Sequence, residues 1–210
     1  MNPKGGAVMI YGKKVKLRPI EENDLPLMVQ WFNDPEIARS VVGWDFPISL
    51  AQQKEWYRNS LNDRKNQRWI IENLDGEVLG LTGLWDIDWH NRQALNAVKL
   101  GRTQDRGKGY GTDTIMAVMA YAFLQVGLNR LWGEIIDYNI GSFQAYVEKC
   151  GWKVEGKLRK SVFRDGTYRD IYRVAILKDE FMSLDKASEY IKIYNHREIK
   201  VKNSHWAVIP

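Results

Sequence analysis

Gln104-Asp105-Arg106-Gly107-Lys108-Gly109-Tyr110-Gly111-Thr112 is the stretch of sequence that decides the fold of this chain. Its three glycines have no Cβ, so the backbone can turn tightly and approach a ligand closely. A helical pattern follows directly, and the free N–H groups at the start of a helix attract anions. Arg106 and Lys108 add positive charge. We therefore predict that the residues from Arg106 to Thr112 cradle a phosphate group.

The glycine loop is flanked by a strand and a helix. After it, apolar residues recur with helical spacing and predict one buried helix face, formed by Ile115, Val118, Met119, Ala122, Phe123 and Val126. Before it, residues 94–100 read as a strand, with Val98 and Leu100 at alternating apolar positions. Strand, glycine loop and helix thus form one structural unit.

Two familiar phosphate loops do not fit this unit. The nucleoside-triphosphatase loop needs a Ser or Thr directly after its lysine, whereas Lys108 is followed by Gly109. The dinucleotide fingerprint G-x-G-x-x-G also fails, because the three glycines are spaced by two throughout. What does fit is R-x-x-G-x-G, formed by Arg106, Gly109 and Gly111.

Length and composition indicate a globular protein. The 210 residues suffice for one domain with a core, and 44% hydrophobic with 27% charged residues is an ordinary balance. No apolar run reaches membrane-spanning length, and residues 1–6 do not resemble a signal peptide. The single cysteine, Cys150, excludes an internal disulfide, and we interpret it as buried packing beside a helix end. We expect a cytoplasmic protein without a metal site, since one cysteine and three dispersed histidines do not suit zinc.

The net charge of +5 and the pI near 9.2 allow an anionic ligand, and nucleic acid is the rival interpretation. However, the positive charges are spread along the chain and mixed with 26 acids. This distribution favours a solvated surface, so we expect neither a nucleic-acid nor a membrane partner.

The remaining patterns predict an ordered series of elements. Helices are expected at residues 25–32, 49–61 and 142–149, the second one opened by a capping box of Ser49 and Gln52. Residues 85–92 read as a connection. Strands are expected at residues 15–18, 69–72, 78–81, 131–136, 152–154, 162–163 and 171–177.

We divide the chain into one domain, residues 1–182, and a C-terminal extension, residues 183–210. Within the extension, residues 190–194 could form a helix, and residues 206–210 are apolar enough to dock on the domain or on a partner subunit.

The glycine motif and this order of elements resemble the GCN5-related N-acetyltransferases, whose corresponding loop holds the pyrophosphate of acyl-coenzyme A. More narrowly, the chain resembles the branch that acetylates ribosomal-protein amino termini and includes spermidine acetyltransferases. The resemblance covers about residues 15–181, and four segments carry it: 31–36 (WFNDPE), 139–152 (NIGSFQAYVEKCGW), 154–159 (VEGKLR) and 165–170 (DGTYRD).

This resemblance implies an α/β (α+β) fold with a mixed, mostly antiparallel central sheet flanked by helices. It implies acetyl-coenzyme A as co-substrate. The strand that ends at Val98 and Leu100 would splay from its neighbour and pair with the pantetheine arm. Asn139 and Ser142 match positions that bond the coenzyme, although both could equally cap a helix.

Tyr146 corresponds to a tyrosine that acts as general acid in the family. A phenol has an ordinary pKa of about 10, so it is protonated at neutral pH and can donate to a departing thiolate. The alternative is a core aromatic, because Tyr146 shares a helix face with Phe143 and Val147.

The general base is left open. Many relatives carry a glutamate on the strand before the loop, but residues 94–97 contain no carboxylate. Asp86, Asp88, His90 and Glu134 are alternatives, as is a water chain, and each acid could also be ordinary surface. Asp86 and Asp88 lie at i and i+2, so in an extended segment they would share a side.

The acceptor is predicted to be a small-molecule or peptide amine. Aromatic residues (Trp31, Trp44, Trp56, Trp85 and Trp89) and acids (Asp45, Asp86 and Asp88) suit a polyamine, an amino sugar, an aminoglycoside or a peptide amino terminus. The aromatics could equally belong to the core. The leading function is an acetyl-coenzyme A-dependent N-acetyltransferase. A non-catalytic acyl-coenzyme A-binding or sensing module is the alternative, and a homodimer is left open.

Overall fold

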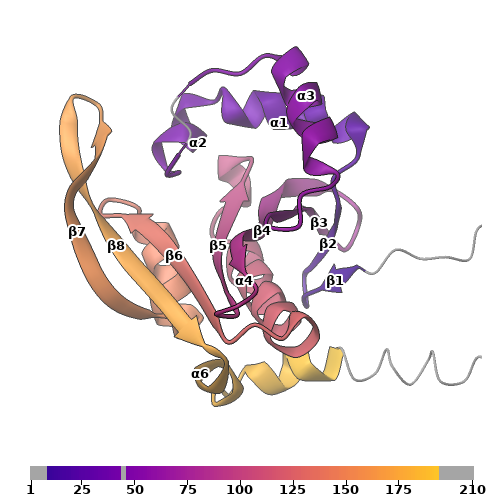
Figure 1. Ribbon diagram of the computed structural model, residues 1–210, viewed down its shortest axis with the longest axis vertical. Helices are drawn as coiled ribbons and strands as arrows, with labels where there is room; N and C mark the ends of the chain where they lie inside the picture. The colour runs from indigo at the N-terminus through magenta and orange to yellow at the C-terminus, as the bar shows by residue number, and fades with distance from the viewer. Residues whose placement is uncertain (1–8, 44–45, 194–210) are drawn as a thin grey trace, which may run out of the picture.

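A computed structural model describes residues 9–43 and 46–193, and its centre is an eight-stranded sheet (Figure 1). The strand order is β1-β2-β3-β4-β5-β6-β8-β7, and every neighbouring pair is antiparallel except β5 and β6. This arrangement confirms the predicted fold class. The strands are β1 (Ile10–Tyr11), β2 (Val15–Pro19), β3 (Gln67–Asn73), β4 (Val78–Asp88), β5 (Gln93–Leu100), β6 (Arg130–Ile136), β7 (Lys153–Arg164) and β8 (Thr167–Leu177).

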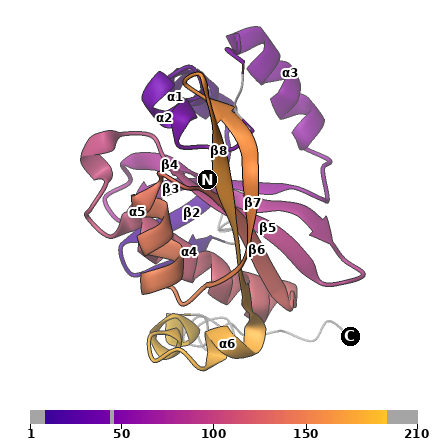
Figure 2. The same ribbon diagram turned by 90° about the vertical axis from the view of Figure 1, so that its left-hand side faces the viewer.

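Helices cover the sheet in separate groups. In Figure 1, α1, α2 and α3 lie together at one end of the molecule and α6 lies at the other; Figure 2 shows α4 and α5 beside the sheet. Their bounds are α1 (Leu25–Phe32), α2 (Pro35–Arg39), α3 (Leu50–Ser60), α4 (Tyr110–Tyr121), α5 (Ile140–Phe143) and α6 (Lys178–Met182). Both α4 and α5 continue as π-helical turns, at Ala122–Val126 and Gln144–Lys149, and residues 187–193 are also helical.

Helix α4 is buried all round rather than on one face. Every residue from Asp113 to Ala120 is buried, so the predicted single apolar face was too narrow. The helix packs on β1, β2 and β5, while the π-helical turn after α5 packs against it as well. Ala187 and Tyr190, from the helical residues 187–193, belong to the same apolar core. The start of α4, which carries the glycine loop, is therefore fixed from several sides.

Several predicted boundaries were wrong. Residues 85–88 are not a connection, because β4 extends through Asp88 with a register shift between Trp85 and Asp88. The two strands expected at 152–154 and 162–163 are one long strand, β7, whose exposed, charged residues hide the apolar alternation. Strand β1 and helix α2 were not predicted. Helix α2 does have a start signal in the sequence. Asp34 caps it by accepting from the N–H groups of Glu36 and Ile37, and Pro35 is its first residue.

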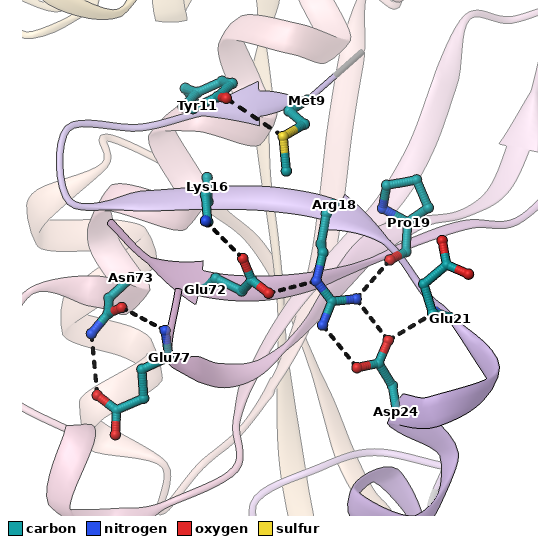
Figure 3. Close-up of polar contacts among 10 residues, drawn as sticks. All are labelled: Met9, Tyr11, Lys16, Arg18, Pro19, Glu21, Asp24, Glu72, Asn73 and Glu77. Carbon is teal, nitrogen blue, oxygen red and sulfur yellow. Dashed lines mark hydrogen bonds and ion pairs between the residues drawn. The ribbon is translucent and has the colours of Figure 1, made fainter. Parts of the chain in front are cut away.

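An ion-pair network fixes the first helices to the sheet (Figure 3). Arg18 on β2 donates to Glu72 on β3 at 2.5 Å and to both carboxylate oxygens of Asp24 at 2.7 and 2.8 Å. Burial alone would raise the pKa of Asp24 and of Glu72. The bonds to Arg18, together with the Glu21 N–H at Asp24 and Lys16 at Glu72, outweigh this effect and lower both pKa values. The network sets where the chain leaves β2 and enters α1.

Candidate active site

The parallel strands β5 and β6 part in the middle of the sheet. They pair only at Gln93↔Arg130, Ala94↔Leu131 and Leu95↔Trp132. Beyond this point β5 stays with β4 as far as Leu100, and β6 stays with β8 as far as Ile136. The predicted splay is thus confirmed. Alternate backbone groups of β5 face the gap, where an extended ligand can supply the hydrogen bonds that a strand would make.

A cavity of about 850 Å³ runs along this gap. It reaches from the glycine loop to residues of α2, β4 and β6. The cavity brings together most of the residues proposed from sequence, namely Asp86, Val98, Leu100, Arg106, Gly107, Gly109, Tyr110, Gly111, Thr112, Glu134, Asn139, Ser142 and Tyr146. Lys108 and Asp88 do not line it.

The glycine loop has the backbone geometry of an anion cradle. Gly109 is the N-cap of α4 and has φ +86°, and Gly107 has φ +78°, a region that favours glycine. A Cβ on Gly107 or Gly111 would meet no protein atom within 4 Å, so both face open space. The N–H groups of the first turn of α4 and this open space together suit a pyrophosphate.

The positive groups of the loop are held by neighbouring acids. Arg106 contacts Glu36 of α2 at 3.2 Å, and Lys108 contacts the buried Asp105 at 3.3 Å. Lys14, which the sequence did not point to, donates to the backbone oxygen of Lys108 at 3.0 Å. The cradle therefore draws on the turn between β1 and β2 as well as on its own residues.

Tyr146 lies at the point where the strands part. Its ring is buried against Trp152, with centroids 4.8 Å apart, and its hydroxyl donates to Oδ1 of Asn96 at 3.0 Å. Burial raises the pKa of Tyr146 well above its usual value, Cys150 adds to this, and the backbone N–H of Val98 acts in the opposite sense. The phenol consequently keeps its proton.

Asn96 is a site residue that sequence reasoning missed. It is buried, and its amide donates to the backbone oxygen of Gly83 at 2.9 Å, which leaves Oδ1 aimed at Tyr146. Its signal in the sequence is a polar residue at the same alternating positions as Val98 and Leu100. Such a residue on a buried strand face needs partners inside the protein.

Asn139 joins the cavity wall to helix α2. Its side chain accepts from the N–H of Ser142 at 3.1 Å, which caps α5, and donates to the backbone oxygen of Ser40 at 3.0 Å. The neighbouring Tyr138 hydroxyl donates to the backbone oxygen of Arg39. These bonds hold the end of α2 and the following turn against the β6–α5 connection, where both line the cavity.

The candidate acids are separated by the tertiary structure. Asp86 lines the cavity with φ +50°. Asp88 instead accepts from the N–H groups of His90 and Asn91, at 3.1 and 2.9 Å, and bonds to Asn91 lower its pKa. The bulge between Trp85 and Asp88 interrupts the alternation, so the expectation that the two acids share a side of an extended segment was wrong. Glu134 lines the cavity and pairs with Arg173 at 2.7 Å.

The candidate aromatic residues also take different places. Trp31 is buried, and a Cβ on Gly101 would collide with its ring, so it is a core residue. The guanidinium carbon of Arg68 lies over the ring of Trp56, 5.1 Å from the ring centroid. Trp85 lines the cavity and Trp89 is exposed. Trp44 and Asp45 lie outside the described residues, as do residues 206–210.

Lys99 is a second cavity residue that the sequence did not single out. It lies on β5 in the parted segment, and its Nζ is 5.1 Å from the ring centroid of Trp85. Removal from water, with a contribution from the positive charge of Arg68, lowers the pKa of Lys99 to about 7. No sequence pattern marks this lysine, because its environment comes from three strands.

Two negative findings apply to residues 9–43 and 46–193. Within them, no three His, Cys, Asp or Glu side chains gather in a way that could hold a metal ion. None of the helices there is long and apolar enough to cross a membrane.

Comparisons with known proteins agree with this geometry. Residues 14–153 match the family model of the acetyltransferase (GNAT) domain. The chain is 28% identical over 173 residues to the spermidine N(1)-acetyltransferase of Escherichia coli, a match covering 82% of this chain and 90% of that protein. It is 27% identical over 170 residues to a prophage-derived uncharacterized N-acetyltransferase of Bacillus subtilis, covering 81% and 93%.

A solved structure is similar as well. The crystal structure of spermidine N-acetyltransferase from Vibrio cholerae in complex with CoA and spermine aligns with a TM-score of 0.75 at 25% identity, covering 81% of this chain and 99% of that one. The family model covers the chain from β2 to the first residue of β7, including the glycine loop and Tyr146. The chain therefore belongs to the GNAT acetyltransferase family and is an acetyl-coenzyme A-dependent N-acetyltransferase.

Proposed function

We propose that this protein moves the acetyl group of acetyl-coenzyme A to a primary amine of a polyamine, with Tyr146 as general acid. The observation that carries the proposal is the position of the Tyr146 hydroxyl. It lies where β5 and β6 part, in one cavity with the glycine loop. A thioester held along the gap would bring its sulfur toward this hydroxyl.

The coenzyme would bind by backbone groups. The N–H groups of the glycine loop and the first turn of α4 take the pyrophosphate, and Arg106 can exchange Glu36 for a phosphate oxygen. The pantetheine arm lies in the gap as a substitute strand, bonded to the backbone of Val98 and Leu100. A backbone N–H of this segment faces the thioester oxygen and stabilises the charge that develops there.

Tyr146 would then protonate the departing thiolate. The burial that raises the pKa of the phenol also disfavours a thiolate in the same cavity, so both proton affinities rise together. Proton transfer between them therefore stays accessible. The Asn96 oxygen holds the hydroxyl in position until the sulfur arrives.

The acceptor would enter at the part of the cavity lined by α2, β4 and β6. Asp86 is an acid there that can attract an ammonium group, and Trp85 offers an aromatic face. Glu134 contributes less, because Arg173 already compensates its charge. Two relatives named as spermidine acetyltransferases, one solved with spermine, support a polyamine as acceptor.

Coenzyme release measured with a panel of amines tests the proposal. The panel contains spermidine, spermine, an amino sugar, an aminoglycoside and a peptide with a free amino terminus. We expect the highest kcat/KM with a polyamine, and mass spectrometry should find the acetylated polyamine. Tight acetyl-coenzyme A binding without transfer to any amine would instead support a sensing module. Preference for the amino sugar or the peptide would overturn the polyamine assignment alone.

A further inference from the structure

We propose that Lys99 is the general base of the reaction and accepts the proton of the attacking ammonium group. This inference rests on the proposed function. Strand β5 contains no carboxylate that could act as general base, and Lys99 would take that role.

Lys99 and Tyr146 approach the gap from opposite faces of β5. Side chains alternate along a strand, so Asn96, which accepts from Tyr146, and Lys99 point to opposite sides. The register of β5 on β4 is continuous from Leu95 to Leu100, so no bulge disturbs this alternation. An acid and a base on the two faces of one strand can serve the two ends of the same transfer.

Contacts of Trp85 bring the lysine amine back toward the parting point. A Cβ on Gly83 would lie 3.1 Å from the Trp85 ring, so the ring covers Gly83. Gly83 in turn pairs with Ala97, the residue after Asn96. Because Nζ of Lys99 lies 5.1 Å from the centroid of this ring, the amine is directed along β5 toward Ala97 rather than toward the glycine loop.

Desolvation and the positive charge of Arg68 favour the neutral form of Lys99, whereas a carboxylate in the same cavity favours the charged form. From β3, Arg68 faces it and adds positive charge, although Asp63, 3.7 Å from Arg68, partly compensates this. From β4, Asp86 lines the same cavity, and from β6, Glu134 does so while paired with Arg173. Desolvation is the largest effect and lowers the pKa of Lys99 to about 7.

The two environments thus shift the pKa values of Tyr146 and Lys99 in opposite directions. Such opposite shifts are how acid and base roles are divided in active sites. Tyr146 is driven toward its protonated form and Lys99 toward its neutral one. A permanently charged lysine at this place would repel a polyamine. A neutral amine can instead accept a hydrogen bond from the ammonium group.

Protons and bonds balance in this scheme. The acceptor R–NH₃⁺ gives one proton to Nζ of Lys99, and the freed lone pair forms the C–N bond at the thioester carbon. The C–S bond breaks, and Tyr146 protonates the sulfur. The nitrogen then loses its second proton to the tyrosinate, which restores Tyr146 and leaves the amide. Lys99 releases its proton to water.

Two substitutions separate proton acceptance from positive charge. Lys99→Met keeps the length without an amine, and Lys99→Arg keeps a charge that cannot be given up. Turnover is measured at saturating coenzyme and spermidine between about pH 5.5 and about pH 9, a range that brackets the expected pKa. We expect wild-type kcat to rise through an ionisation near pH 7. In both variants kcat should fall about 10²–10⁴-fold, and this rise should be absent.

Controls distinguish the possible failures. Acetyl-coenzyme A affinity by calorimetry should match wild type in both variants, and Lys54→Met on the exposed face of α3 should behave as wild type. An arginine variant that retains turnover, or a methionine variant that retains the ionisation, would overturn the role of Lys99 while leaving the acetyltransferase intact. A wild type that acetylates no amine would overturn both.

A direct titration needs no variant activity. With ¹³C-labelled lysine, the Lys99 resonance is identified as the one lost in Lys99→Arg, and its shift is followed against pH in the wild-type protein. A midpoint near 7 supports the inference. A midpoint near the ordinary value of about 10.4 would overturn it even if the methionine variant does not fold.

Discussion

The hydroxyl of Tyr146 and the side-chain oxygen of Asn96 lie 3.0 Å apart, on a helical turn and a strand that are 50 residues apart in sequence. The bond fixes the phenol at the point where the pairing between β5 and β6 ends. The sequence pattern also allowed Tyr146 to be an ordinary core residue. The bond to Asn96 instead holds its hydroxyl at the place where a thioester would lie.

Tyr146→Phe removes this proton donor and keeps the ring that packs on Trp152. We expect kcat to fall about 10²–10⁴-fold, the usual contribution of general acid catalysis. Acetyl-coenzyme A affinity, measured by calorimetry, should change little. Full turnover, with the chemical step shown to limit the rate, would contradict the acid role. A loss of turnover that follows a loss of folded protein would favour a core role instead.

The glycine loop allows strain to be separated from ligand contact. Gly109→Val forces a branched residue into φ +86° and should lower both stability and coenzyme affinity. Gly111→Ala adds only one methyl group, in a place with no protein atom within 4 Å. This second variant should keep the thermal midpoint and still weaken acetyl-coenzyme A binding, because the methyl group occupies ligand space. Unchanged affinity in both would place the pyrophosphate elsewhere.

Asp86 and Asp88 should respond differently to the same change. Asp86→Asn suits the positive φ and removes a charge from the cavity, so KM for spermidine should rise. The expected effect is about 1 kcal/mol or less, and it should shrink in high salt. Asp88→Asn should leave KM alone and lower stability, because an amide NH₂ would replace the carboxylate oxygen that accepts from Nδ2 of Asn91 at 2.7 Å. Equal KM values for parent and Asp86→Asn at low salt would remove Asp86 from the acceptor site.

Asp113 should connect the C-terminal extension to the stability of the domain. Its carboxylate accepts from the N–H groups of Lys13, Lys14 and Val15, at 2.7 to 3.0 Å, and from the Tyr190 hydroxyl at 2.6 Å. Tyr190→Phe should cost about 1.5–3 kcal/mol of unfolding free energy, the range for a hydrogen bond to a charged group. Asp113→Asn should cost more, because its amide nitrogen would face two of the four donors, which then lose their acceptor.

Urea unfolding measures both changes, and the double variant gives their coupling. Additive effects would show that Tyr190 and Asp113 act independently, which would contradict docking of residues 187–193 through this bond.

The sequence by itself determined the local units of this protein. The glycine loop at the start of α4 and the capping box at Ser49 each depend on the conformations of a few adjacent residues. Such patterns can be predicted from sequence because the backbone preferences behind them depend on neighbouring residues. The glycine loop, the order of the main elements and the family resemblance can therefore be read directly from the order of the residues.

Only the tertiary structure decided the contents of the site. The parting of β5 from β6, the bond from Tyr146 to Asn96 and the separate fates of Asp86 and Asp88 depend on partners distant in sequence. The sequence prediction divided strand β7 into two short strands, because the exposed polar residues of β7 interrupt its apolar pattern. Helix α2 was not predicted, although Asp34 caps it. Lys99 is the clearest case. Its type is written in the sequence, but its lowered pKa results from desolvation and from Arg68 on another strand, and electrostatic environment is a property of packing rather than of order along the chain.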